Sequence, residues 1–280
     1  MGVNIYAFAD EASPFIDEQI LHMKKNGVKG LEIRGVDRVN VSEISLRTAK
    51  EVRAKLEAEG LFTWSIGSPI GKIDIVTGDF KTHIEKFKRT LEIAEAMACD
   101  NIRLFSFFMP KECADPTIYR DEVLERMGVF VDVAKGSSVT LCHENEKGIY
   151  GDNAERALEI VKAFPTIKNV FDPANYVQVG QDTKEAWAML KDYTKYLHIK
   201  DAMLDGKVVP AGSGAGNVEY IVKEYMKMGG NDFTIEPHLT VFDGLKALES
   251  DNVEKSVAGY VFSSKEEAFA VAVDAFKKLV

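Results

Sequence analysis

The sequence predicts one (β/α)8 barrel that spans residues 1–280, and three observations support this prediction. A short apolar or β-branched run followed by an amphipathic segment recurs eight times along the chain, as in a (β/α)8 barrel. The turn after the first run, ADEAS at residues 9–13, contains no glycine, whereas a doubly wound sheet that binds a dinucleotide usually has a Gly-rich turn there. No linker divides the chain, so we expect a single barrel domain.

The expected strands are short runs, most of which follow a turn signal. In chain order they cover residues 3–9, 30–34, 62–67, 101–107, 139–145, 169–172, 196–200 and 232–236. The segments between them predict helices over residues 15–26, 41–59, 79–98, 116–135, 152–164, 183–191, 217–228 and 264–280. Asp79 and Ser264 stand where N-caps are expected. The connection at residues 237–263 is the longest loop, and its aromatic residues suggest that it folds over the barrel mouth or contacts a second subunit.

Composition excludes several classes of function. The chain has 35 Lys and Arg against 44 Asp and Glu, a net charge of −9, which disfavours binding to nucleic acid or to an anionic membrane. No apolar stretch reaches the roughly 18 residues of a membrane span, and the N-terminus lacks the pattern of a signal peptide. The three cysteines lack metal-site spacing, which suits a reducing compartment. We expect a cytoplasmic protein whose partners are small molecules, with a homo-oligomer as an open alternative.

Four residues that can bind a metal ion stand at the ends of four consecutive expected strands. They are Glu144, Asp172, His198 and Glu236, each about one strand-helix unit after the one before. Because the carboxyl ends of barrel strands meet at one face, these side chains should point toward one place. Three carboxylates there would repel one another without a cation, and a divalent ion resolves the repulsion. The donor set favours Mn²⁺ first, then Mg²⁺, with Co²⁺, Fe²⁺ or Zn²⁺ as alternatives.

This Glu, Asp, His, Glu series resembles that of the xylose isomerase-like TIM-barrel superfamily of sugar isomerases and epimerases. The resemblance covers essentially the whole chain and is most specific in its second half. It implies that Glu144, Asp172, His198 and Glu236 hold the metal, and that Glu144 and Glu236 are also the catalytic acid and base. A sugar carbonyl bound to the ion would make the adjacent C–H acidic through an enediolate, and a carboxylate would take the proton.

Two positions depart from the pattern of this superfamily. The Asp-x-x-His pattern after the sixth strand ends here in Asn175, and the Glu-Asn-His pattern after the fifth strand ends here in Glu146. Both residues are predicted substrate contacts. The departures leave the substrate undetermined, without affecting the predicted metal ligands.

Further substrate contacts are predicted next to the ligands. Lys200 and Asp201 follow His198, and His238 has the same strand parity as Glu236. Lys200 either polarises a carbonyl or pairs with a carboxylate, and His238 contacts either substrate or a packed loop. His143 faces the helices and is expected to be structural.

Whether the substrate is phosphorylated stays open. Arg34 and Arg103 could serve an anionic group. The stretch VVPAGSGAG at residues 208–216 stands where many barrels bind phosphate. It contains no Lys and follows a turn at Asp205-Gly206, so a flexible hairpin is the favoured alternative.

The leading hypothesis is a metal-dependent isomerase or epimerase that acts on a keto sugar or a sugar phosphate. A lyase on the same site, which dehydrates an inosose or cleaves a glycoside, is the second hypothesis. An apurinic endonuclease is weaker, because such enzymes use many histidines and this chain has five. The alternative outside the enzyme class is a barrel that binds sugar without converting it to a product.

Overall fold

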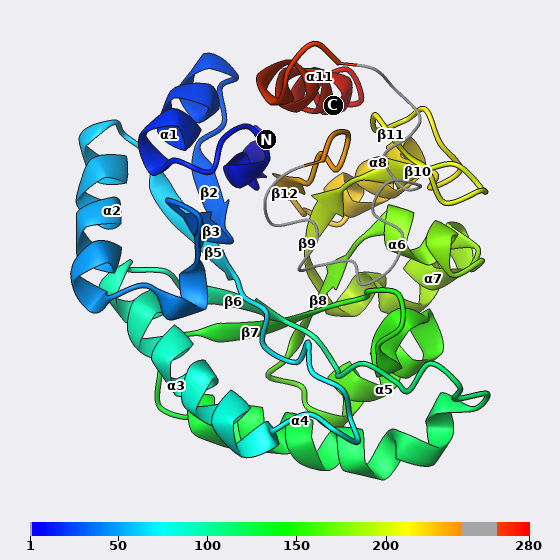
Figure 1. Cartoon of the computed structure of the whole chain (residues 1–280). Coiled ribbons are helices and arrows are strands. Elements are labelled where there is room, and N and C mark those ends of the chain that lie inside the picture. Colours follow the sequence, from blue (N-terminus) through cyan, green and yellow to red (C-terminus); the bar gives the residue numbers. More distant parts are fainter. Residues whose placement is uncertain (1, 242–261) are drawn as a thin grey trace.

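The computed structural model describes residues 2–241 and 262–280, and it confirms the predicted barrel. Eight parallel strands close on themselves in the order β1, β12, β9, β8, β7, β6, β5, β2 (Figure 1). Their bounds are β1 Asn4–Ala7, β2 Gly30–Ile33, β5 Phe62–Gly67, β6 Asn101–Leu104, β7 Thr140–Glu144, β8 Lys168–Phe171, β9 Thr194–Ile199 and β12 Asp232–Ile235. Each predicted strand overlaps one of these.

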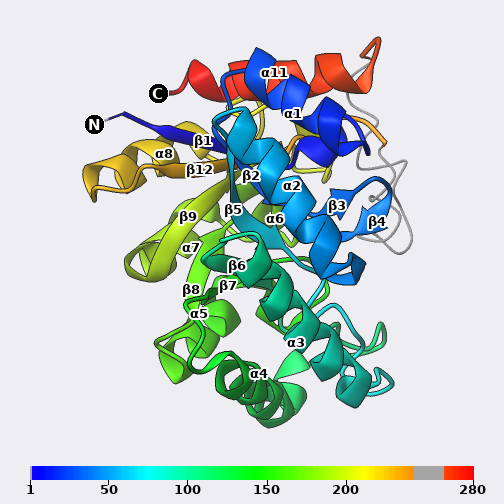
Figure 2. The same cartoon turned by 90° about the vertical axis from the view of Figure 1, so that its left-hand side faces the viewer.

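Helices surround the barrel, as both cartoon views show (Figures 1 and 2). The helices that follow the eight strands are α1 Ile16–Lys25, α2 Leu46–Ala58, α3 Phe80–Ala96, α4 Arg120–Ala134, α5 Ala154–Ala163, α7 Thr183–Leu190, α8 Val218–Lys227 and α11 Lys265–Lys277. Asp79 and Ser264 cap α3 and α11 as predicted, since their side chains accept the amide protons of Thr82 and Glu267. Amphipathic spacing and capping residues thus locate these helices in the sequence.

Several short elements were not predicted. Helix α6, Pro173–Gln178, begins directly after β8, because Asp172 accepts the amide proton of Asn175 and proline occupies the first turn. Two antiparallel hairpins also leave the strand ends: β3 Gly35–Val36 with β4 Val39–Asn40, and β10 Asp201–Ala202 with β11 Val208–Val209. Short 3-10 helices cover Ala9–Glu11, Val41–Glu43, Pro116–Tyr119, Tyr150–Asp152 and Lys191–Tyr193.

The barrel interior is built in layers. Cys142, Val170 and Tyr196 form an apolar cluster of their own, on strands β7, β8 and β9, against which Trp64 packs. Since side chains alternate along a strand, the next inward-facing position on each strand is two residues later. Those positions are Glu144, Asp172 and His198. An apolar layer therefore lies directly beneath the predicted metal ligands.

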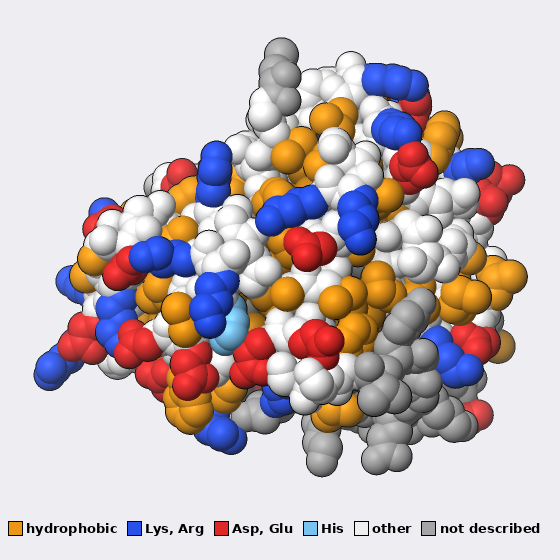
Figure 3. Space-filling model, turned by 90° about the horizontal axis from the view of Figure 1, so that it is seen from above, with side chains coloured by type: hydrophobic (Ala, Val, Ile, Leu, Met, Phe, Trp, Pro, Cys, Tyr) orange, Lys and Arg blue, Asp and Glu red, His pale blue; other side chains and the backbone are white. Residues whose placement is uncertain are grey.

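The long loop and the helices outside the barrel were each the subject of a prediction. The predicted long loop, 237–263, lies mostly outside the described residues, so its suggested contact with the mouth or a second subunit stays a prediction. Among the helices of residues 2–241 and 262–280, none has the length and apolar character needed to cross a membrane. On the face seen in Figure 3, Lys and Arg side chains are interspersed with Asp and Glu.

Candidate metal centre

The structure brings the four predicted ligands together at one end of the barrel. Glu144 ends β7, Asp172 directly follows β8, His198 lies in β9 and Glu236 directly follows β12. One ligand atom from each of the four lies within 4.8 Å of the others, and all four side chains are buried. The order of the strands places the two glutamates at the ends of an arc, with Asp172 and His198 between them.

The geometry and chemistry of this cluster fit one divalent ion. Ligands at about 2.0–2.2 Å from an ion lie at most about 4.4 Å apart, close to the span of the cluster. Nδ1 of His198 is 2.9 Å from Oε1 of Glu144, so this nitrogen faces the cluster. Oδ2 of Asp172 has no hydrogen-bond donor among the described residues, although Nζ of Lys200 approaches it at 2.9 Å as an ion pair. A buried carboxylate oxygen that accepts no hydrogen bond can bind a cation.

The protein supplies cations of its own to the cluster, which corrects one step of the sequence argument. Nη1 of Arg103 lies 2.6 Å from Oε2 of Glu144. Nζ of Lys200 lies 2.9 Å from Asp172 and 2.8 Å from Glu236, and Nη1 of Arg34 lies 3.4 Å from Glu236. The carboxylates still repel one another, since Glu236 and Glu144 raise the pKa of Asp172. Three basic side chains share in neutralising them, so a divalent ion is not the only cation that can offset this repulsion.

These cations set the ionisation of the carboxyl groups. Burial alone would raise the pKa of Glu144, but His198 and Arg103 lower it to about 2. Lys200 and His238 likewise overcome burial and hold the pKa of Glu236 well below its usual range. At Asp172 burial prevails over Lys200 and raises the pKa to about 7. The two glutamates are thus ionised at neutral pH.

A buried carboxylate that the sequence analysis missed orients His198. Nε2 of His198 lies 3.2 Å from Oε2 of Glu32, whose other oxygen accepts a hydrogen bond of 2.9 Å from the Tyr196 hydroxyl. Burial disfavours the charged imidazole, yet Glu144 and Glu32 together raise the pKa of His198 well above its usual value. With Nε2–H directed at Glu32, the proton on Nδ1 is the one that a metal ion would displace to bind this nitrogen.

Comparison with known proteins places this chain in a family. No match is found among curated protein sequences. The family model described as xylose isomerase-like TIM barrel matches residues 20–251. The chain belongs to this family.

Solved structures of the xylose isomerase-like barrels share the fold at low sequence identity. A probable 3-DHS dehydratase, AsbF, from Bacillus anthracis has a TM-score of 0.74 at 15% identity, with 99% of each chain covered. The IOLI protein with a binding zinc atom has a TM-score of 0.74 at 15% identity, over 99% of this chain and 98% of that one. D-psicose 3-epimerase from Clostridium cellulolyticum H10 has a TM-score of 0.73 at 15% identity, over 98% of each chain.

The residues at which this chain departs from the pattern of its superfamily lie beside the cluster. Nδ2 of Asn175 donates to the carbonyl of Asn145 at 2.8 Å and lies 3.5 Å from Oε1 of Glu144. Glu146 accepts a hydrogen bond of 3.0 Å from Nζ of Lys72. Lys72 comes from the loop after β5 and also lies over the ring of Phe105. Both predicted contacts are thus engaged within the protein, and their contact with substrate stays a prediction.

The remaining predicted contacts have different surroundings. Lys200 pairs with carboxylates, one of its two predicted roles. His238 donates its amide proton to Glu11 at 2.6 Å, and its Nε2 lies 3.4 Å from Oε1 of Glu236. Asp201 directs its carboxylate at backbone amides instead of the cluster. His143 contacts the hydroxyl of Ser106 at 2.9 Å and lies outside the cluster, as expected for a structural residue.

Proposed function

We propose that this protein is a divalent-metal-dependent isomerase or epimerase that acts on a keto sugar or a sugar phosphate. The observation that carries the proposal is the placement of Glu144 and Glu236 at the two ends of the ligand arc, both buried and both ionised at neutral pH. Two carboxylates at one site can remove a proton from one face of a substrate and return it on the other. The similar fold of a known 3-epimerase is consistent with this proposal.

Glu144, Asp172, His198 and Glu236 would hold the ion. When bound, a divalent ion polarises a substrate carbonyl as a Lewis acid and makes the neighbouring C–H acidic. We take Mn²⁺ as the first candidate because oxygen donors outnumber nitrogen donors in the cluster.

The two glutamates differ in how firmly the protein holds them. Oε2 of Glu144 is 2.6 Å from Nη1 of Arg103. Oε1 of Glu236 has longer contacts, 3.4 Å to Nη1 of Arg34 and 3.4 Å to Nε2 of His238. A carboxylate oxygen with weaker contacts exchanges them for a substrate proton at lower cost. We therefore assign the first proton removal to Glu236. Glu144, ionised at rest, would take up a proton from solvent before it donates that proton to the opposite face, and Glu236 would release its own proton to solvent.

Proton exchange with solvent tests the proposal. The Mn²⁺-loaded protein is incubated with a panel of keto sugars in D₂O, and recovered sugars are analysed for deuterium and for change of configuration. Glu236→Gln should lower the exchange rate by on the order of 10³-fold, because the amide cannot accept the proton. Glu51→Gln, at an exposed position on α2, is the matched control and should exchange like the unaltered protein.

The alternatives give different products. Unsaturated or cleaved product with no isomerised sugar would replace the isomerase by the lyase hypothesis, which shares the same first proton removal. If no sugar in the panel exchanges a C–H proton with the metal bound, the sugar-binding, non-catalytic barrel becomes the better account. If Glu236→Gln retains exchange within tenfold of the unaltered protein, the assignment of the base is wrong.

A further inference from the structure

The glycine-rich loop between β11 and α8 satisfies the amide groups of residues 212–216 from within the protein. The amides of Gly212 and Gly214 donate to Oδ2 of Asp201 at 3.0 and 2.9 Å, and the amide of Gly216 donates to Oδ1 at 2.8 Å. The two amides between them donate to backbone carbonyls, Ser213 to Pro210 and Ala215 to Ala202. Every amide from residue 212 to residue 216 therefore has an acceptor within the protein.

Two of these glycines are required by the approach of the Asp201 carboxylate. A Cβ atom on Gly214 would lie 2.5 Å from Oδ1 of Asp201, and a Cβ atom on Gly216 would lie 2.6 Å from the same oxygen. Such distances are far inside van der Waals contact. The glycines thus shape the loop around an internal carboxylate, which explains the run GSGAG without an external anion.

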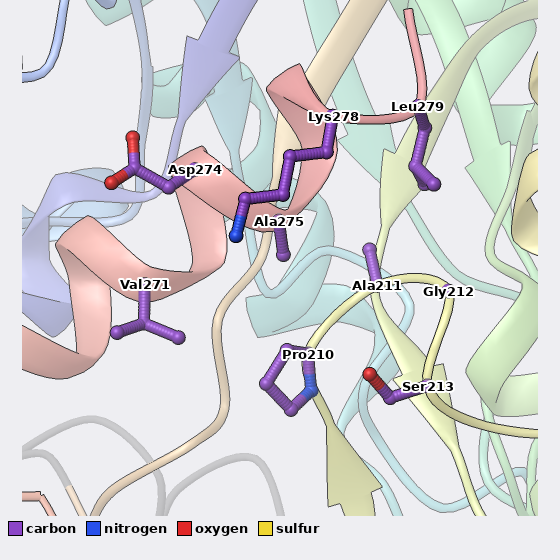
Figure 4. A pocket seen from close by; sticks show the side chains of 9 residues that line it. All are labelled: Pro210, Ala211, Gly212, Ser213, Val271, Asp274, Ala275, Lys278 and Leu279. Atoms are coloured by element: carbon purple, nitrogen blue, oxygen red, sulfur yellow. The ribbon is translucent and has the colours of Figure 1, made fainter.

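In many barrels the loop at this position binds a phosphate group through its amides. Here the Asp201 carboxylate takes the place of such an anion. The first turn of α8, which follows the loop, carries the acidic residue Glu219, and a carboxylate there also disfavours a second negative charge. Figure 4 shows Ala211, Gly212 and Ser213 of this loop across a pocket from residues of α11, and none of the predicted ligands lines this pocket.

A second, independent observation concerns the basic side chains buried around the mouth. Arg103 pairs with Glu144, Lys72 with Glu146, and Lys200 with Asp172 and Glu236. Arg34 pairs with Asp10, Glu11 and Glu236. Each of these cations has at least one carboxylate partner already. A phosphate dianion would have to displace a buried carboxylate to gain a partner, and the displaced charge would be left uncompensated.

We propose that the substrate is an uncharged keto sugar and not a phosphate ester, and that Asp201 is a specificity-determining residue that fills the phosphate position of the barrel with its own carboxylate. This inference rests on the proposed function, because only an enzyme has a substrate. The exclusion of phosphate concerns binding alone and does not depend on activity. A Cβ atom on Gly216 would lie 3.2 Å from Cβ of Pro173, the residue after Asp172, so the loop that Asp201 holds packs beside the segment that carries this ligand. Its role is to exclude an anion there, which differs from the direct substrate contact predicted from sequence.

Binding of inorganic phosphate to the full-length protein tests the role of Asp201. Phosphate is titrated and followed by phosphorus NMR and by calorimetry, first with the unaltered protein and then with Asp201→Ala. The unaltered protein should show no saturable binding in the millimolar range, and Asp201→Ala should bind phosphate at least about tenfold more tightly, because three amides lose their acceptor. Asp205→Ala, an exposed aspartate in the same β10–β11 hairpin, is the matched control and should bind no better than the unaltered protein.

The substrate class is tested with matched pairs of a keto sugar and its phosphate ester. The free sugar should be preferred by roughly a hundredfold or more in kcat/KM. Saturable phosphate binding by the unaltered protein, or a phosphate ester preferred over its free sugar, would overturn the inference. So would a folded Asp201→Ala variant that gains no phosphate binding. If Asp201→Ala does not fold, Asp201→Asn replaces it, with the same expected direction. Absence of turnover with every sugar would count against the proposed function alone, because the phosphate titration does not depend on activity.

Discussion

The four predicted metal ligands come from β7, β8, β9 and β12, whereas most of the groups that hold them come from β2 and β6. Glu144, Asp172, His198 and Glu236 each stand at or near a strand end in the second half of the chain. Glu32 lies within β2, Arg34 directly follows it, and Arg103 lies within β6. The first half of the barrel thus fixes the position and charge of groups that the second half presents.

This difference explains the electrostatics of the cluster. The second half contributes three carboxylates together with His198 and Lys200. The first half contributes the guanidinium groups of Arg34 and Arg103. A divalent ion would add further positive charge to the cluster and would compete with Lys200 for oxygens of Asp172 and Glu236. The contribution of each half of the barrel can therefore be measured by removing one charged group at a time.

Lys200→Met should have the largest effect. Removing one partner from a buried ion pair typically destabilises a protein by about 3–5 kcal/mol. Asp172 would lose its 2.9 Å ion pair, and Glu236 would lose its 2.8 Å ion pair while it keeps Arg34 at 3.4 Å. We expect the metal-free variant to unfold at a lower temperature, and Mn²⁺ to raise its Tm by more than it raises that of the unaltered protein. Thermal unfolding with and without Mn²⁺ measures both shifts. Lys223→Met, at an exposed position on α8, is the control. An equal or smaller metal-induced shift in Lys200→Met would show that Lys200 does not compete with the ion.

Arg103→Met should change the rate and its pH dependence. The nearby guanidinium helps to hold the pKa of Glu144 at about 2, against burial. Loss of this positive charge disfavours the carboxylate, so the pKa of Glu144 should rise. Because Glu144 must be ionised to bind the metal ion, the acid limb of the exchange rate should move to higher pH. We expect a rate lower by roughly 10–100-fold at neutral pH.

A conservative variant separates charge from packing at this position. Arg103→Lys retains the positive charge and should return the acid limb most of the way toward its original position, although it lacks the planar geometry of the guanidinium. If the acid limb of Arg103→Met coincides with that of the unaltered protein, Arg103 has only a packing role.

The same comparison shows what could be predicted from sequence. Eight strand-helix repeats and the spacing of four strand-end ligands are local, periodic signals, and they indicated the fold and the cluster. Glu32 gave no such signal, because it is a single acidic residue inside the strand GLEI. Its role is visible only in the closed barrel, where its side chain on β2 reaches His198 on β9. Arg34 and Arg103 were noticed as basic residues, but their partners lie 202 and 41 residues away in sequence. Pairings of this kind depend on tertiary structure.

Glu32→Gln should have the smallest effect of the three variants. The amide oxygen can still accept the Nε2–H of His198, so the ring orientation should persist while the negative charge is lost. A second carboxylate makes a ligating imidazole a stronger donor, and its neutralisation should therefore weaken Mn²⁺ binding by about tenfold, the lower end of the range for groups that orient ligands. Competition with a chelator measures this affinity. Ser65→Ala removes the 3.4 Å hydrogen bond to Glu32 and a 3.3 Å contact with the Tyr196 hydroxyl, but it keeps the charge of Glu32 and should leave the affinity nearly unchanged. Unaltered or tighter Mn²⁺ binding by Glu32→Gln would mean that the first half of the barrel holds His198 in place without tuning it as a ligand.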